Sequence, residues 1–209
     1  MSRELAAVRR YLLLVVIACS IGVVLLGRAP DDESLRLALR VQARISFAFF
    51  SAALASVGLA LLLPSPASAW LLRHRSSLYW AFSLSHLIHG GWILLWLWLT
   101  PNRLSWNVVD VSGGLAFPVV ALLAYVQTQH AQGRLPARAR IEAWSVGYVW
   151  LQFVGFFIDR LLTPERRSLL PWYLAAIGCS LTAAALAWCG RGQAQARSGA
   201  TYSNNVDTR

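Results

Sequence analysis

Apolar residues along this chain fall in six long runs, and short polar or charged segments separate one run from the next. The runs occupy residues 11–26, 45–63, 78–100, 107–126, 141–162 and 169–188. A helix needs about 20 apolar residues to cross the hydrocarbon core of a bilayer. The pattern therefore predicts an all-α fold, a polytopic membrane helix bundle with six transmembrane helices within residues 1–190. Residues 191–209 are polar and rich in Gly, Ser and Asn, which predicts a disordered C-terminal tail.

The first run has the length of a signal-peptide core, and the segment from Val16 to Cys19 loosely resembles a lipoprotein cleavage box. Apolar residues continue through Leu26 without a clean small-residue site. The sequence therefore predicts a retained helix here.

A stripe of arginines precedes the second run. Arg36, Arg40 and Arg44 recur every four residues and so share one helix face. Acidic residues before them, at 31–33, favour a helix start at this point. The sequence leaves two alternatives: residues 33–44 lie along the membrane interface, or they extend the second helix into water.

Composition and charge agree with a membrane protein. Hydrophobic residues make up 57% of the chain and charged residues only 13%, against about 25% charged in soluble domains. The net charge of +10 would suit a nucleic-acid partner, but the arginines sit in short segments between the apolar runs. Basic residues in that position are typical of membrane flanks, so a lipid bilayer and no nucleic acid is predicted as partner.

The distribution of the arginines predicts an orientation. With six crossings, eleven arginines fall on the side of the chain ends and eight on the other side. Because basic residues concentrate in cytoplasmic loops, we expect both termini to be cytoplasmic, in a bacterial inner membrane.

Two histidines lie near the middle of the third run. His86 and His89 are spaced i,i+3 and share one helix face with Tyr79 and Ser83. An imidazole at that depth has no polar partner in lipid, so the pair should face the bundle interior. This makes the histidine pair the candidate functional site.

A second polar stripe occurs in the fifth run, at Ser145, Tyr148 and Gln152. Lipid offers these side chains no hydrogen-bond partner either. We expect the two stripes to face each other inside the bundle.

The other candidate groups have ordinary explanations. Asp110 and Asp159 lie near the ends of their runs, where ion pairs with arginines are more common than proton-relay roles. Cys19, Cys179 and Cys189 lack metal-ligand spacing and are predicted to be buried small apolar residues. The sequence contains no nucleophile triad or phosphate-binding loop, so no catalytic residue is assigned.

Haem b is the natural cofactor for histidines at this depth, because a helix bundle can hold a porphyrin between imidazoles of different helices. One helix cannot supply both axial ligands of one iron. The remaining histidines, His74 and His130, fall at the membrane surface and cannot lie opposite His86. A site with His86 or His89 as iron ligand is therefore predicted to lack its second histidine.

Two segments resemble a known family. The segment 75–89 (RSSLYWAFSLSHLIH) and the segment 140–153 (RIEAWSVGYVWLQF) resemble helices of ferric-reductase-like transmembrane proteins. These are six-span haem b bundles and include the membrane haem subunit of the bacterial methionine sulfoxide reductase system. The likeness extends over roughly residues 40–162. It implies haem b, with His86 or His89 as an axial ligand.

The second segment departs from the family at one position. Gly147, Tyr148, Trp150 and Phe153 fit the family's pattern, but Trp144 stands where its ligand histidine falls. An indole N–H donates hydrogen bonds and cannot coordinate iron.

The resemblance implies at most an electron-transfer subunit, because no flavin or nicotinamide domain follows the last run. Its electrons would come from quinol or from a redox partner protein. The alternative is a haem-free membrane scaffold or partner subunit derived from the same bundle. A small transporter is a third alternative, although the six runs contain no evident internal repeat.

Overall fold

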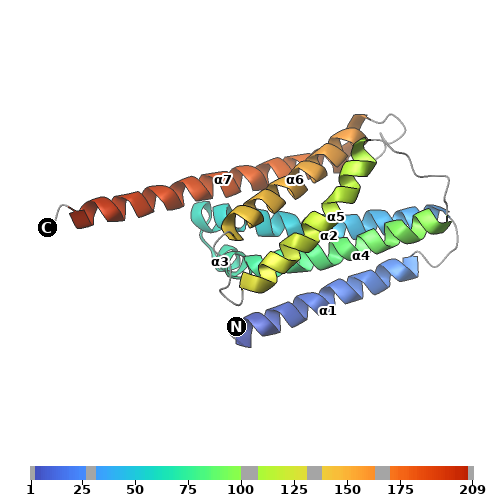
Figure 1. Ribbon diagram of the computed structural model, residues 1–209, viewed down its shortest axis with the longest axis horizontal. Helices are drawn as coiled ribbons and strands as arrows, with labels where there is room; N and C mark the ends of the chain where they lie inside the picture. Colours follow the sequence, from blue (N-terminus) through green and yellow to red (C-terminus); the bar gives the residue numbers. More distant parts are fainter. Residues whose placement is uncertain (1–2, 27–31, 100–107, 131–137, 163–169, 207–209) are drawn as a thin grey trace.

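The computed structural model describes residues 3–26, 32–99, 108–130, 138–162 and 170–206, and these contain α-helices and no strand. The helices are α1 (Arg3–Leu26), α2 (Asp32–Leu62), α3 (Pro66–Arg73), α4 (Arg75–Leu99), α5 (Val108–His130), α6 (Arg138–Leu162) and α7 (Leu170–Val206) (Figure 1). The predicted all-α fold is confirmed.

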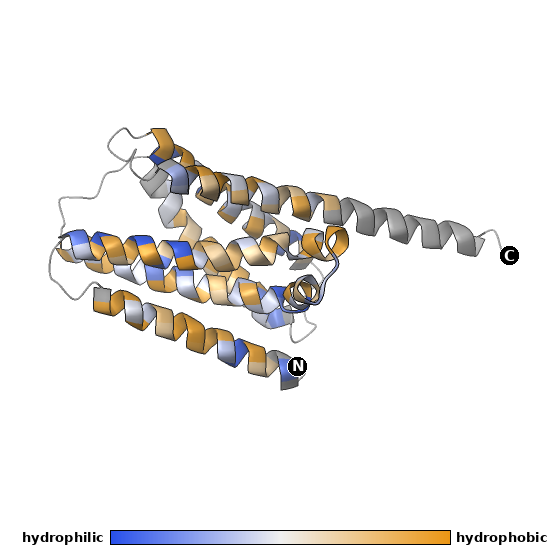
Figure 2. Ribbon diagram, turned by 180° about the vertical axis from the view of Figure 1, so that it is seen from behind, coloured by the Kyte–Doolittle hydropathy of each residue, from blue (hydrophilic) through white to orange (hydrophobic). Residues whose placement is uncertain are grey.

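Within the described residues, five helices are long and apolar enough to cross a membrane. Their spans are Ala6–Leu25, Glu33–Leu62, Arg75–Leu99, Ala139–Leu162 and Pro171–Cys189. Helix α5 occupies the fourth predicted run but is not among these five. Hydrophilic residues gather toward the ends of the long helices, and apolar residues fill their middle parts (Figure 2). The structure thus supports an integral membrane protein.

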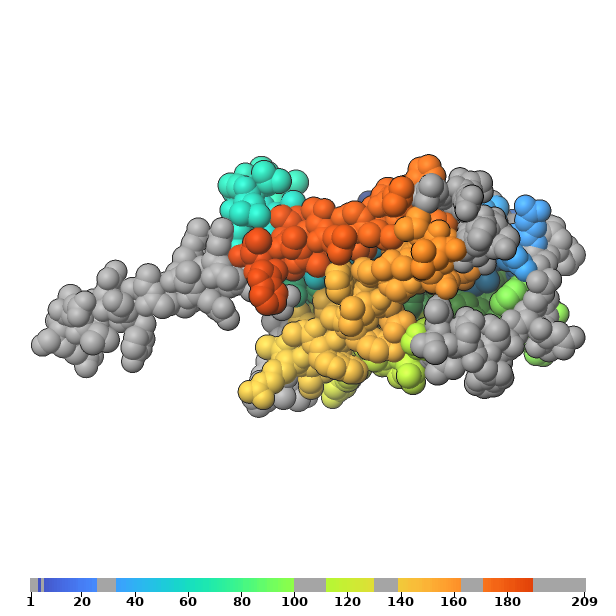
Figure 3. Space-filling view, turned by 90° about the horizontal axis from the view of Figure 1, so that it is seen from above, coloured from blue at the N-terminus to red at the C-terminus, as the bar shows by residue number. Residues whose placement is uncertain are grey.

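Five long helices form a closed ring. Helix α2 packs against α4 and α7, α4 packs against α5, α5 against α6, and α6 against α7. Helices α6 and α7 lie side by side on one face of the molecule (Figure 3). The N-terminal end of α1 and the C-terminal end of α7 lie at the same end of the bundle (Figure 1).

Helix α1 lies outside this ring, against α2 and α4. Arg9 Nη2 donates to the Gln127 carbonyl of α5 at 3.1 Å, and Glu4 pairs with Arg73 at 3.4 Å. These polar contacts attach the N-terminal half of α1 to the end of the bundle that carries α3.

Phenyl rings from opposite helices fill the centre of the ring. Phe47 of α2 contacts Phe153 and Phe157 of α6, with ring centroids 5.2 and 5.1 Å apart. Phe50 of α2 contacts Phe82 of α4 at 5.1 Å and Phe153 at 5.5 Å. Helices α2 and α6 are not neighbours in the ring of helices. The phenyl contacts between them therefore fill the interior of the bundle. Each edge-on or tilted pair adds about 0.5–1.5 kcal/mol beyond its buried area.

A buried group of hydrogen-bonded polar side chains, the Gln42–Ser85 node, joins α2 to α4. Gln42 Nε2 donates to the carbonyl and to the hydroxyl of Ser85, at 3.1 and 3.0 Å. Ser46 Oγ lies 3.0 Å from Ser85 Oγ, and none of the three residues is exposed. Lipid cannot replace these hydrogen bonds, so they fix the register of the two helices.

Helix α2 differs from the predicted second run. It begins at Asp32 and continues without a break to Leu62, so residues 33–44 extend this helix rather than lying as a separate interfacial segment. Leu35, Ala38 and Gln42 in this extension are buried. Packing of these residues holds the extension against the bundle.

Helix α7 also differs from its prediction. It continues through Val206, whereas residues 191–209 were expected to be disordered. Ala, Gln and Arg recur in this part of the chain. These residues have high helix propensity, which continues the helix past the last apolar position.

The contact between α2 and α7 generates a stability prediction. A Cβ added at Gly58 would overlap the Leu186 backbone, whereas one added at Gly155 on α6 would meet no atom within 4 Å. We expect Gly58→Leu to lower the free energy of unfolding by about 1–3 kcal/mol through overpacking. Thermal unfolding in detergent measures this, with Gly155→Leu as the matched control. Equal stability of the two variants would contradict the close α2–α7 contact.

Candidate functional site

The histidine pair lies at mid-depth of α4. His86 is eleven residues after Arg75 and ten before Trp96. At 1.5 Å per residue these separations are about 16 and 15 Å. The end of α4 at Leu99 is thirteen residues from His86, so His86 lies close to the middle of the helix.

His86 packs among aromatic rings of three helices. Its ring stacks on Phe117 of α5 at 5.3 Å between centroids, and it lies 5.4 Å from Phe82 and 5.9 Å from Phe153 of α6. Gly90 allows Phe117 to come this close, because a Cβ there would lie 2.6 Å from Cε1 of Phe117. His86 is thus part of the central aromatic cluster.

His89 lies beside His86, with 5.6 Å between the ring centroids. The Nδ1 atom of each ring is buried and has no hydrogen-bond partner within the described residues. A buried polar atom left unpaired costs about 1–3 kcal/mol. Buried side-chain atoms without a partner also occur at other described residues, such as Ser83, Gln127 and Ser145. The histidine pair therefore remains the candidate site that the sequence predicts.

An ion pair sets the register of α4 and α6. Arg75 Nη2 lies 3.0 Å from Glu142 Oε1, so the N-terminal ends of the two helices are level. His86 and Phe153 each follow eleven residues after their member of this pair. Phe153 is therefore the residue of α6 at the level of His86, in agreement with the contact between their rings.

Trp144, the position that the resemblance assigns to a second ligand, lies elsewhere. It precedes Phe153 by nine residues, or about 13 Å along the helix. Its side chain is 59% exposed and stacks on Tyr148 at 5.8 Å. A side chain at this position does not face His86.

The other two histidines do not complete the site. His74 lies at the junction of α3 and α4, where its Nδ1 is 2.9 Å from the Trp70 carbonyl and its Nε2 is 3.9 Å from Glu4. It precedes His86 by twelve residues, or about 18 Å. The side chain of His130 is outside the part of the chain that the structure describes.

The residues present do not fit a haem held between two axial ligands. Among the described residues, the two imidazoles at this depth, those of His86 and His89, both belong to α4. Phe82, Phe117 and Phe153 occupy the space beside His86. A porphyrin would have to displace these rings.

The two predicted polar stripes each contain a buried serine. Ser83 of α4 and Ser145 of α6 are fully buried. Tyr148, however, donates its hydroxyl to the Ser112 carbonyl of α5 at 2.9 Å. The stripe on α6 therefore has one member buried in the interior and another bonded to α5.

The predictions of ion pairing for the aspartates and of burial for the cysteines have different outcomes. Asp159 lies 3.9 Å from Arg160 on the same helix, as expected for a structural ion pair, and the side chain of Asp110 is outside the described residues. The prediction of buried cysteines is wrong for Cys179 and Cys189, which are exposed on α7. Both cysteines lie on the exposed face of α7, whereas Tyr173, Ala176, Ser180 and Ala183 occupy its buried face.

Sequence reasoning missed Glu142 as the partner of Arg75. An acidic residue one position inside the fifth apolar run was the available signal, because intramembrane charges are usually paired.

Comparison of this chain with protein-family models, with curated proteins and with solved structures finds no match.

The Arg75–Glu142 pair can be tested by charge exchange. Each reversal alone, Arg75→Glu or Glu142→Arg, places like charges together and should destabilise the bundle by at least about 1 kcal/mol, since Glu142 is largely buried. The double exchange should recover most of the loss in thermal unfolding experiments. Reversals at the exposed pair Arg73 and Glu4 are the control and should change the unfolding temperature little. Additive losses in the Arg75/Glu142 double exchange would contradict the pairing.

Proposed function

We propose that this chain is a haem-free integral membrane subunit, which resembles the ferric-reductase-like bundle and serves as a scaffold or partner subunit in the membrane. One observation carries the proposal: Phe153, and no histidine, lies at the level of His86 on α6. The packed aromatic centre is a second support, because it leaves the interior filled by protein side chains.

A six-span topology forms part of this proposal. Helices α4 and α6 run in the same direction, because Arg75 and Glu142 pair at their N-terminal ends. The chain must therefore return across the bundle between Leu99 and Arg138. Helix α5 packs against both α4 and α6 and has 23 residues, enough for this return.

The topology predicts where reporter fusions appear. Fusions after Arg134 and Arg191 should report the cytoplasmic side, and a fusion after Arg103 the opposite side. Alkaline phosphatase and fluorescent-protein reporters measure this in bacterial cells. Identical sides for the fusions after Arg103 and Arg134 would exclude α5 as a span.

The proposal predicts a spectrum without haem. A reduced-minus-oxidised absorption spectrum of the full chain, purified after expression with haem supplied, should contain no haem band. Trp144→His should leave the spectrum unchanged, because this side chain faces outward. A low-spin bis-histidine spectrum from the unchanged protein would refute the proposal.

A haem-binding electron-transfer subunit is the second candidate, and the unpaired Nδ1 atoms of His86 and His89 favour it. Haem bound through one of these histidines would be five-coordinate, high-spin and able to bind carbon monoxide. Combined replacement of both histidines by alanine would remove its absorbance. Phe153→His, but not Trp144→His, would then shift the spectrum toward the low-spin form. This subunit would need quinol or a redox partner protein as its electron donor.

A further inference from the structure

The N-terminal part of α2 extends beyond what a membrane crossing requires. The helix has 31 residues, or about 46 Å, against a hydrocarbon core of about 30 Å. The N-terminal end of α2 lies at the end of the bundle away from the chain ends (Figure 1). This extension carries Arg36, Arg40 and Arg44.

A tryptophan beside Arg44 places that arginine near the headgroup level. The Arg44 guanidinium lies 4.6 Å from the ring centroid of Trp172, and that of Arg36 lies 6.0 Å from Trp96. Trp172 and Trp188 are sixteen residues apart on α7, which is about 24 Å and close to the thickness of the hydrocarbon core. Tryptophans at such separations mark the two membrane–water interfaces. Lipid phosphates lie at this same depth.

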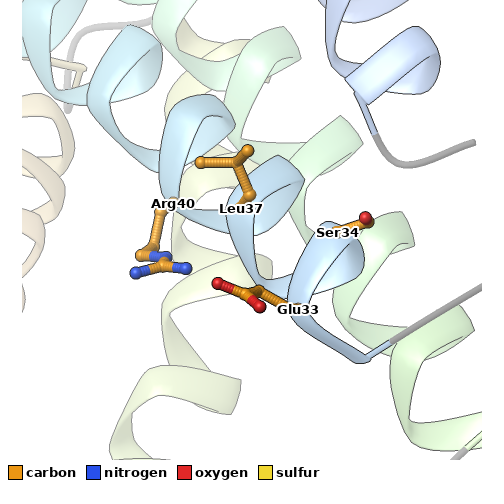
Figure 4. A pocket seen from close by; sticks show the side chains of 4 residues that line it. All are labelled: Glu33, Ser34, Leu37 and Arg40. Atoms are coloured by element: carbon orange, nitrogen blue, oxygen red, sulfur yellow. The ribbon is translucent and has the colours of Figure 1, made fainter. Parts of the chain in front are cut away.

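Arg40 is exposed beside an apolar surface. Its Nε donates to the Arg36 carbonyl at 3.1 Å, and its guanidinium borders an open depression of about 250 Å³ lined also by Glu33, Ser34 and Leu37 (Figure 4). Leu37 is 41% exposed, so an acyl chain can lie against it. Glu33 lines the same depression, and its carboxylate is turned toward the Arg40 guanidinium (Figure 4).

No carboxylate among the described residues forms an ion pair with Arg40 or Arg44. A guanidinium presents a planar set of donors that matches a phosphate group. Asp31, Asp32 and Glu33 match the three arginines in number, but Arg40 and Arg44 are the two arginines farthest from them along α2. Their guanidinium groups therefore carry the positive charge of this surface. An anionic lipid satisfies this charge better than a zwitterionic lipid, whose own ammonium group offsets its phosphate.

We propose that Arg40 and Arg44, together with Leu37, form a binding surface for the headgroup phosphate of an anionic phospholipid in the leaflet at this end of the bundle. The surface is separate from the histidine pair and independent of whether haem is bound.

Native mass spectrometry of the full chain in a neutral detergent tests the proposal. Phosphatidylglycerol and phosphatidylcholine with identical acyl chains are titrated, and the ratio of their adducts is measured. We expect a preference for phosphatidylglycerol that falls about fivefold for each arginine replaced, from the attraction of a surface arginine to anionic lipid. The test variant is Arg40→Gln with Arg44→Gln.

The matched control removes the same charge at the opposite end of the bundle, through Arg10→Gln with Arg140→Gln; both side chains are exposed. A retained preference in the test variant, or an equal loss in the control, would overturn the proposal. Arg40→Lys with Arg44→Lys keeps the charge and should retain the preference, which separates lipid binding from a folding defect. Displacement of phosphatidylglycerol by inorganic phosphate alone would assign the surface to a free anion and overturn the lipid proposal.

Discussion

Contacts made inside the ring of helices hold this bundle together. Lipid tails are as apolar as leucine, so burial of apolar area does little to associate helices within a bilayer. The association depends instead on close packing and on hydrogen bonds that lipid cannot replace. The phenyl rings that meet between α2 and α6, the Gln42–Ser85 node and the Gly58 contact with α7 supply both kinds of contact. The site is part of the same packing, because His86 takes a place among those rings.

Hydropathy predicts where helices lie along the chain but not how they rotate or align. The apolar runs located the long helices, and the depth of His86 followed from its position in the third run. The direction of Trp144 did not follow, because it depends on the register that Arg75 and Glu142 impose between α4 and α6. The course of α7 past Trp188 also escaped prediction, since low hydrophobicity argues against a membrane span but does not argue against a helix.

The same register changes how the family resemblance applies. Motif matching along the sequence assigns Trp144 to a ligand position, whereas the folded helices bring Phe153 to the histidine pair. The segment with the motif is helical in this structure, and its Trp144 does not face the histidine pair. Arg75, which begins the resemblance, contributes through its contact with Glu142 and through the Tyr79 ring, 5.1 Å from its guanidinium.

Gly90 of α4 allows a side chain of the neighbouring helix α5 to contact His86. Phe117 lies in the notch left by the missing side chain at Gly90 and stacks on His86 from there. The position of the Phe117 ring therefore depends on Gly90 of α4, one turn beyond His86, as well as on α5. A side chain introduced at position 90 would displace the Phe117 ring and so change the environment of His86. A genetic search for residues that affect the histidine pair would then find a glycine, which has no side chain to contribute to the site.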